Sequence, residues 1–183
     1  MLPPLSRVFE ICLYSLLNFF PFLIFALYPF LDDLRFSRTK TGLLIVVLTF
    51  LQILFGLLAC FSTGNISAVL SLISTLSYAF FYFTVIRKSP GQLLFVLLMI
   101  SNIANLVVIT AKCLEGQFFP DFALLPYRYS MSLFMVIVEI FILIPVFIFL
   151  KKVITPAISC SQSFHEWRYL WLIPATFYLI WYY

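Results

Sequence analysis

The run GLLIVVLTFLQILFGLLACFS, residues 42–62, decides the fold, because it contains no charged side chain. About 20 consecutive apolar residues are enough for a helix to cross the hydrocarbon core of a bilayer. Further apolar runs of similar length lie at 8–31, 66–86, 91–112 and 131–150, and a shorter one lies at 166–183. The chain is therefore predicted to be all-α, a polytopic transmembrane helix bundle of five full spans plus a sixth that ends early.

The composition of the whole chain agrees with this interpretation. Hydrophobic residues make up 64% of the 183 residues, charged residues make up 10%, and the mean hydropathy is +1.12. Soluble domains average roughly 45–50% apolar and about 25% charged residues. A soluble core of this size could not bury so much apolar surface, so residues 1–183 are predicted to form one transmembrane helical domain.

Basic residues are distributed unevenly over the connections between the predicted spans. The connections after the first, third and fifth spans hold eight of them: Arg35, Arg38, Lys40, Arg87, Lys88, Lys151, Lys152 and Arg168. The opposite side holds Arg7, Lys112 and Arg128, each with an acid not far away in sequence. Because lysine and arginine near span ends are retained on the cytoplasmic side, the N-terminus is predicted to lie outside.

The last apolar run is short. From Tyr169 to Tyr183 it has 15 residues, fewer than the roughly 20 that a span needs. It is interpreted as part of a span in a longer protein. The alternative is a complete six-helix protein whose last helix ends in an aromatic interfacial belt at 181–183.

Two local signals concern the connection before this last run. Ser163 and Glu166 have the spacing of a capping box, which predicts that the helix begins near Phe164. A short interfacial helix is predicted to begin at Thr155 and Pro156, because proline is favoured in the first turn of a helix.

Motifs for catalysis or metal binding are absent from the sequence. The chain has no phosphate-binding glycine loop, no H-E-x-x-H and no C-x-x-C. Its single histidine, His165, is interpreted as an ordinary interfacial residue, and Cys12, Cys60, Cys113 and Cys160 as small packing residues. Cys60 and Cys113 both lie near outer span ends, but the sequence does not show whether they pair. No catalytic residue, metal ion or cofactor is therefore expected.

Four polar residues lie deep within the predicted spans. They are Asn18, Asn102, Asn105 and Glu139, at similar depths. An unsatisfied polar group is costly in hydrocarbon and tends to face the bundle interior or a cavity, so Glu139 is expected to be protonated or hydrogen-bonded to such asparagines. The four are predicted to be ligand-binding or switch positions. The alternative interpretation is that they hold the helices together by hydrogen bonds.

Small side chains recur at a spacing of four in the third predicted span. Ser67, Ser71, Thr75 and Ala79 are predicted to form a stripe that lets a neighbouring helix approach closely. The same stripe could instead line a polar cavity, because Ser74 and Ser77 add further hydroxyl groups.

The longest outer connection is predicted to run from Cys113 to Ser130. It mixes acids, prolines and aromatic residues, so it is the expected outward-facing contact surface. Asp121 and Arg128 are predicted to make the contacts there.

Two stretches, RVFEICLYSLLNFFPFLIFALYPFLDDLRFSRTK at 7–40 and HEWRYLWLIPATFYLIWYY at 165–183, resemble the membrane sensor region of GHKL-type sensor histidine kinases from Gram-positive bacteria. The resemblance implies a multi-pass protein of the bacterial plasma membrane. It also implies a further helix and a cytoplasmic kinase part, and neither lies within these residues. The expected function is therefore to sense an extracellular or intramembrane signal and to transmit it by helix rearrangement.

The expected partners follow from the same resemblance and from the apolar surface. They are the lipid bilayer, a second copy of the chain, and a peptide or small amphipathic ligand. A response regulator would be reached only through the missing kinase part, and no nucleic-acid partner is expected. The alternative function is a six-helix membrane transporter subunit that binds a small substrate.

Overall fold

The computed structural model describes residues 5–62, 64–125, 127–160 and 164–180, with no side-chain description for 164–166. The described residues form α-helices, one 3-10 turn, one π-helical turn and one isolated β-bridge, which confirms the all-α prediction. In chain order the elements are α1 (Leu5–Leu27), η1 (Tyr28–Phe30), α2 (Arg38–Phe61), α3 (Asn65–Val85), α4 (Pro90–Phe118), α5 (Pro120–Ala123), α6 (Tyr129–Phe149), η2 (Leu150–Ile154), α7 (Thr155–Cys160), α8 (Phe164–Leu170) and α9 (Leu172–Ile180).

The described residues contain five helical segments that are long and apolar enough to cross a bilayer. They begin with α1, α2, α3, α4 and α6, as the hydropathy pattern predicts. The sixth predicted segment is divided between α8 and α9. These helices fit a multi-pass membrane protein.

Helix α4 is longer than the sequence indicates. The predicted span ends at 112, whereas α4 continues to Phe118 and so takes up the first part of the predicted outer connection. Lys112 Nζ and Glu115 Oε2 lie 2.7 Å apart within this last part of the helix. The helix then ends beside Pro120, because the residue before a proline is disfavoured in α conformation.

Helix α6 also continues beyond its predicted end at 150. The π-helical turn η2 joins it directly to α7, so the helix predicted at Thr155 and Pro156 is present as an extension of α6. The backbone N–H of Thr155 donates to the carbonyl of Leu150, five residues earlier. Such a turn accommodates Pro156, which has no N–H to donate and would crowd the carbonyl four residues before it.

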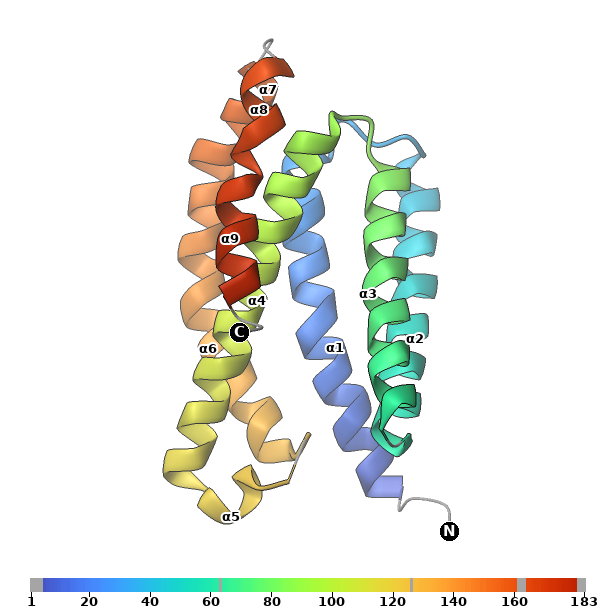
Figure 1. Cartoon of the computed structure of the whole chain (residues 1–183), viewed down its shortest axis with the longest axis vertical. Coiled ribbons are helices and arrows are strands. Elements are labelled where there is room, and N and C mark those ends of the chain that lie inside the picture. Colours follow the sequence, from blue (N-terminus) through green and yellow to red (C-terminus); the bar gives the residue numbers. More distant parts are fainter. Residues whose placement is uncertain (1–4, 63, 126, 161–163, 181–183) are drawn as a thin grey trace.

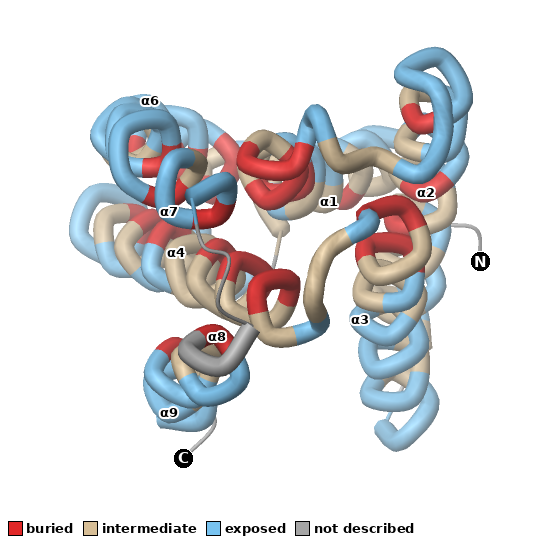
Figure 2. The backbone as a smooth tube through the Cα atoms, turned by 90° about the horizontal axis from the view of Figure 1, so that it is seen from above, coloured by how far each residue is buried: buried red, intermediate tan, exposed pale blue. Residues whose placement is uncertain are grey.

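The helices form two groups that meet at α1 (Figures 1 and 2). In the first group, α2 and α3 form an antiparallel hairpin. In the second, α4 packs against α6, α8 and α9. Helix α1 lies between them and packs against α2, α4 and α6, whereas α3 and α4 have little contact although they follow each other in the chain.

The core lies along α1, α4 and α6 and extends to the basic end of α3. Leu23, Ala26, Val107 and Met135 are fully buried there. Tyr82 is also fully buried, and its hydroxyl donates to the carbonyl of Ala26 at 3.2 Å. The opposite faces of the helices are apolar and exposed, as a surface in contact with lipid requires.

Two of the basic connections are joined to each other at one end of the molecule. Leu34 and Ile86 form the isolated β-bridge, with Arg35 N donating to Val85 O and Arg87 N to Asp33 O, both at 2.8 Å. Figure 1 shows these connections at the upper end of the bundle, the same end as α7 and α8. The eight basic residues of the alternate connections therefore gather at one end.

Candidate functional site

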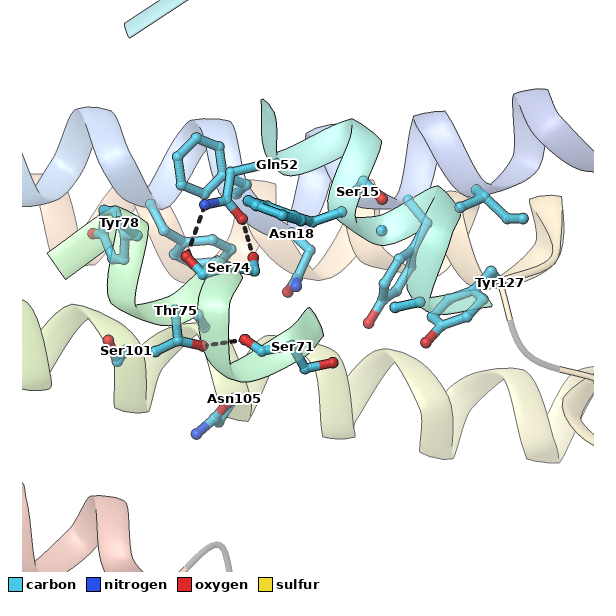
Figure 3. A pocket seen from close by; sticks show the side chains of 18 of the residues that line it. Ser15, Asn18, Gln52, Ser71, Ser74, Thr75, Tyr78, Ser101, Asn105 and Tyr127 are labelled. Atoms are coloured by element: carbon cyan, nitrogen blue, oxygen red, sulfur yellow. Dashed lines mark hydrogen bonds between the residues drawn. The ribbon is translucent and has the colours of Figure 1, made fainter. Parts of the chain in front are cut away.

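A cavity of about 370 Å³ lies between the two helix groups. Helices α1, α2, α3 and α4 form its walls, and Tyr127 and Tyr178 also contribute. Its polar lining consists of hydroxyl and amide side chains (Figure 3): Ser15, Asn18, Gln52, Ser71, Ser74, Thr75, Ser101 and Asn105. Asn18, Thr75 and Asn105 lie near the middle of their helices, so the cavity lies near the middle of the spans.

One wall of the cavity is held by a buried amide. Gln52 Nε2 donates to Ser74 O at 2.9 Å and to Ser77 Oγ at 3.2 Å, and the Ser74 hydroxyl donates to Gln52 Oε1. These bonds join α2 to α3 near mid-depth. Interhelical hydrogen bonds of this kind contribute about 0.6 kcal/mol on average in membrane proteins, so they keep the hairpin together as a unit.

The hairpin approaches α1 at a glycine. A Cβ atom added to Gly56 would overlap Ser15 Oγ of α1, and both residues line the cavity. Glycine therefore lets α2 lie against α1 at this point.

Several lining hydroxyls donate to their own helices. Thr75 Oγ1 donates to Ser71 O at 3.0 Å, and Ser101 Oγ donates to Leu97 O at 2.8 Å. A hydroxyl that donates in this way still has lone pairs that can accept. These side chains therefore offer acceptors to the cavity.

Asn18 differs from Gln52, the amide that joins α2 to α3. Figure 3 shows Asn18 among the labelled side chains that line the cavity. Its amide has no hydrogen-bond partner in the described part of the chain, and neither has that of Asn105, which lies on the α4 wall. Asn18 therefore presents a donor and an acceptor that the fold does not satisfy.

The other two predicted switch residues lie outside the cavity. Asn102 Nδ2 donates to Pro174 O of α9 at 2.8 Å and to Leu98 O of α4 at 2.9 Å. Glu139 is buried on α6, and its Oε1 atom has no hydrogen-bond partner among the described residues. The structure thus does not bring the four residues into one cluster, and it does not show the hydrogen bond expected between Glu139 and an asparagine.

The predicted stripe on α3 faces more than one environment. Ser71 and Thr75 line the cavity, and Ser67 accepts a hydrogen bond from Ser71 through its carbonyl. Ala79 packs against the buried core. The close neighbour of α3 is α2, while its contact with α4 is slight.

An ion-pair cluster lies beside the end of the cavity that is remote from the basic connections. Glu10 Oε2 is 2.9 Å from Arg7 Nη1 and 3.4 Å from Arg128 Nη1, so Arg128 is joined to α1. Arg7 also donates to Tyr127 O at 3.4 Å. Asp121, which is predicted to contact an outside partner, is exposed in the first turn of α5.

Tyr127 forms part of the cavity wall at this end. Its φ angle of 59° is uncommon for a residue other than glycine, and its ring centroid lies 4.6 Å from that of Tyr14. Burial raises the pKa of the Tyr127 phenol, so the phenol stays neutral at physiological pH.

A second buried acid joins α4 to the start of α6. Glu115 is fully buried, pairs with Lys112, and accepts a hydrogen bond from the Ser130 hydroxyl. From the hydropathy pattern Glu115 is predicted to lie in an outer connection, and its contact with Ser130 is not predicted. The spacing of three residues between Lys112 and Glu115 is the signal that could have indicated a continuing helix.

Other residues considered from the sequence add no site. Cys12, Cys60, Cys113 and Cys160 are free thiols. The capping box at Ser163 lies outside the described residues, and the side chains of His165 and Glu166 do as well. Among the described residues no group of histidine, cysteine, aspartate and glutamate side chains could hold a metal ion.

Comparisons with known proteins provide no relative. No family model, no curated protein and no solved structure matches the chain. The function is therefore inferred from the geometry of the described residues.

Proposed function

We propose that the chain is the membrane-embedded sensing region of a signalling protein, with the cavity between α1, α2, α3 and α4 as its ligand site. The main observation behind this proposal is the cavity, which is lined by hydroxyl and amide groups near the middle of the spans. Polar groups in hydrocarbon tend to face a cavity or a functional pathway. A small amphipathic ligand is the occupant that such a lining suits.

The arrangement of the helices supports a mechanism for transmission. The hairpin of α2 and α3 is held together by Gln52, and it touches the second group mainly through α1. A ligand that contacts both groups would favour one of their relative positions, and it could do so only by its differential affinity for the two. Movement of the hairpin would then be passed to the basic end, where Arg35 N donates to Val85 O.

The proposed orientation places the basic end in the cytoplasm. At the other end, the three basic residues Arg7, Lys112 and Arg128 are matched in number by the acids Glu10, Glu115 and Asp121. Alkaline phosphatase fused after Leu124 should be active, and the same fusion after Ser89 should be inactive. The reverse pattern would reject the orientation.

Coupling to a GHKL-type kinase is proposed from the resemblance. Translation of the native reading frame beyond Tyr183 should reveal a further apolar span followed by a soluble kinase part. A stop codon directly after Tyr183 would exclude a kinase encoded in the same chain.

A transporter subunit is the second candidate. It is favoured by the position of the cavity, because substrate sites of secondary transporters lie near mid-bilayer between two moving parts. Reconstituted protein that moved a small solute across a vesicle membrane would support this candidate over the sensor.

Access to the cavity tests the site that both candidates need. In a variant whose four cysteines are replaced by alanine, Ala104→Cys places a thiol on the cavity wall, and Leu106→Cys places one on an exposed face of the same helix. N-ethylmaleimide should modify the thiol at 104 faster than the one at 106, because thiolate formation needs a polar environment.

Thiol modification of the same two cysteine variants also tests the function. In the protein encoded by the whole native reading frame, modification at 104 should change basal or induced output, while treatment of the 106 variant should not. An unreactive thiol at 104, or unchanged output after complete modification, would reject the cavity as the sensing site.

A further inference from the structure

We propose that the ligand of this cavity is uncharged and carries a carboxamide or a similar group with both a donor and an acceptor, and that Asn18 binds that group. The inference rests on the proposed function and names the class of ligand. Its three supports are the charge of the lining, the hydrogen bonds of the lining amides, and the aromatic residues around them.

The lining carries no charged side chain among its described residues, and this argues against an ionic ligand. No aspartate, glutamate, lysine, arginine or histidine is found among the described residues that line the cavity. The ion-pair cluster of Glu10, Arg7 and Arg128 is not part of the lining either. A charged ligand would lose its hydration at mid-bilayer without gaining a counter-charge, and this loss is costly.

The hydrogen bonds of the lining distinguish one amide from another. Gln52 is occupied by Ser74 and Ser77, so it has a structural role. Asn18 is exposed to the cavity and has no partner among the described residues. An amide offers a carbonyl acceptor and an NH2 donor side by side. A carboxamide is the complementary group, because its own NH2 donor and carbonyl acceptor can pair with the acceptor and the donor of Asn18 in one plane.

Aromatic side chains next to Asn18 offer an apolar contact surface for the rest of the ligand. Phe19 follows it on α1, and its ring contacts that of Tyr78 on α3 with centroids 5.5 Å apart. Tyr14 and Tyr127 form a second ring pair toward the outer end. Such rings favour a flat apolar body. The ligand is therefore amphipathic, with a neutral polar head and an aromatic or similarly flat body.

A set of matched probes tests this assignment on the purified full chain in mild detergent. The probes are benzamide, benzoate, benzylammonium and ethylbenzene, which share a ring and differ in charge and hydrogen bonding. Binding is measured by ligand-detected NMR. Benzamide should bind in preference to the other three.

Asn18→Leu should weaken benzamide binding about tenfold, because the bound carboxamide would lose its partner while the cavity keeps its volume. Asn102→Leu is the matched control, since that amide faces α9 and lies outside the cavity. It should change benzamide binding less than about twofold. The unfolding temperature of each variant shows whether it is folded, and Asn18→Ser replaces Asn18→Leu if the latter does not fold.

Each other outcome overturns the assignment. Equal or stronger binding of benzoate or benzylammonium would contradict an uncharged ligand. Binding of benzamide that survives loss of the Asn18 amide would contradict the role of Asn18, and so would the absence of binding by all four probes. These failures are distinct from failure of the proposed function, because thiol modification at Ala104→Cys reports access to the cavity whatever the ligand is.

Discussion

The hairpin of α2 and α3 and the pair formed by α4 and α6 are all apolar enough to span a bilayer, but they differ in packing. In the most apolar part of α4, 28% of residues are buried, against 6% in α3. The α4 and α6 pair buries Val107 and Met135 completely, while α3 leaves Leu72 and Leu76 exposed. Hydropathy therefore selects the spans, whereas contact with other helices depends on the shape of each surface.

The polar residues of the two regions differ in the same way. In the α4 and α6 pair, Glu115 is enclosed and satisfied by Lys112 and Ser130. On the hairpin side, Ser71 and Thr75 face a cavity. Helix α4 thus encloses Glu115 together with its partners, whereas the hairpin turns these two hydroxyl side chains toward the cavity.

The largest effect is expected from removing a buried side chain of the second group. Met135→Ala should lower the free energy of unfolding by about 3 kcal/mol, because Met135 is fully buried and the structure would close the resulting cavity only in part. SDS titration in mixed micelles measures this change. Leu72→Ala on α3 is the control and should have little effect. Equal losses would break the proposed contrast between the regions.

A glycine of α4 provides the second prediction. A Cβ atom at Gly91 would overlap the carbonyl oxygen of Trp167 in α8 and lie 2.9 Å from its carbonyl carbon. Since backbone atoms cannot rotate away, Gly91→Ala should cost about 2 kcal/mol by the same titration. Faster proteolysis between α7 and α8 should accompany the loss. An unchanged titration curve would mean that α8 does not rest on α4.

The third prediction concerns the bonds that hold the hairpin together. Gln52→Leu should cost about 1 kcal/mol, because it removes the bonds to Ser74 and Ser77 while preserving most of the volume. The change should also alter the rate of thiol modification at Ala104→Cys, since both residues line the cavity. A loss of stability without any change in that rate would show that the hydrogen bonds of Gln52 do not affect the shape of the cavity.

The smallest effect is expected at the glycine where the hairpin meets α1. Gly56→Ala would overlap only the Ser15 hydroxyl, which can rotate. Alanine also favours the helix by up to about 1 kcal/mol over glycine, so the net change should be below about 0.5 kcal/mol. A loss as large as that of Gly91→Ala would show that the contact of α2 with α1 is as rigid as that of α4 with α8.

The spans could be predicted from the sequence because their cause is local. Each apolar run of about 20 residues must satisfy its own backbone groups in hydrocarbon, and a helix does so within one segment. The end of α4 was misjudged for a related reason. Lys112 and Glu115 look like loop charges in a hydropathy pattern, but they neutralise each other within one helical turn.

The candidate site could be predicted only in part. Their polarity within a span marked Asn18, Asn102 and Asn105 equally as candidate site residues. It could not show which of them face the cavity and which face another helix. In the structure Asn102 bonds to α9 while Asn18 lines the cavity. Gln52 was not considered, although it is a polar residue in the middle of the run that decides the fold.

The sequence by itself determined that the chain is helical, that five segments can span a bilayer, and that basic residues alternate between connections. These properties depend on the length, hydropathy and charge of single segments. The tertiary contacts are needed to see that α3 has little contact with α4, that a cavity forms between the groups, and which polar side chains line it. The physical reason is that lipid and neighbouring helices are equally apolar, so partner choice depends on close packing and on a few interhelical hydrogen bonds.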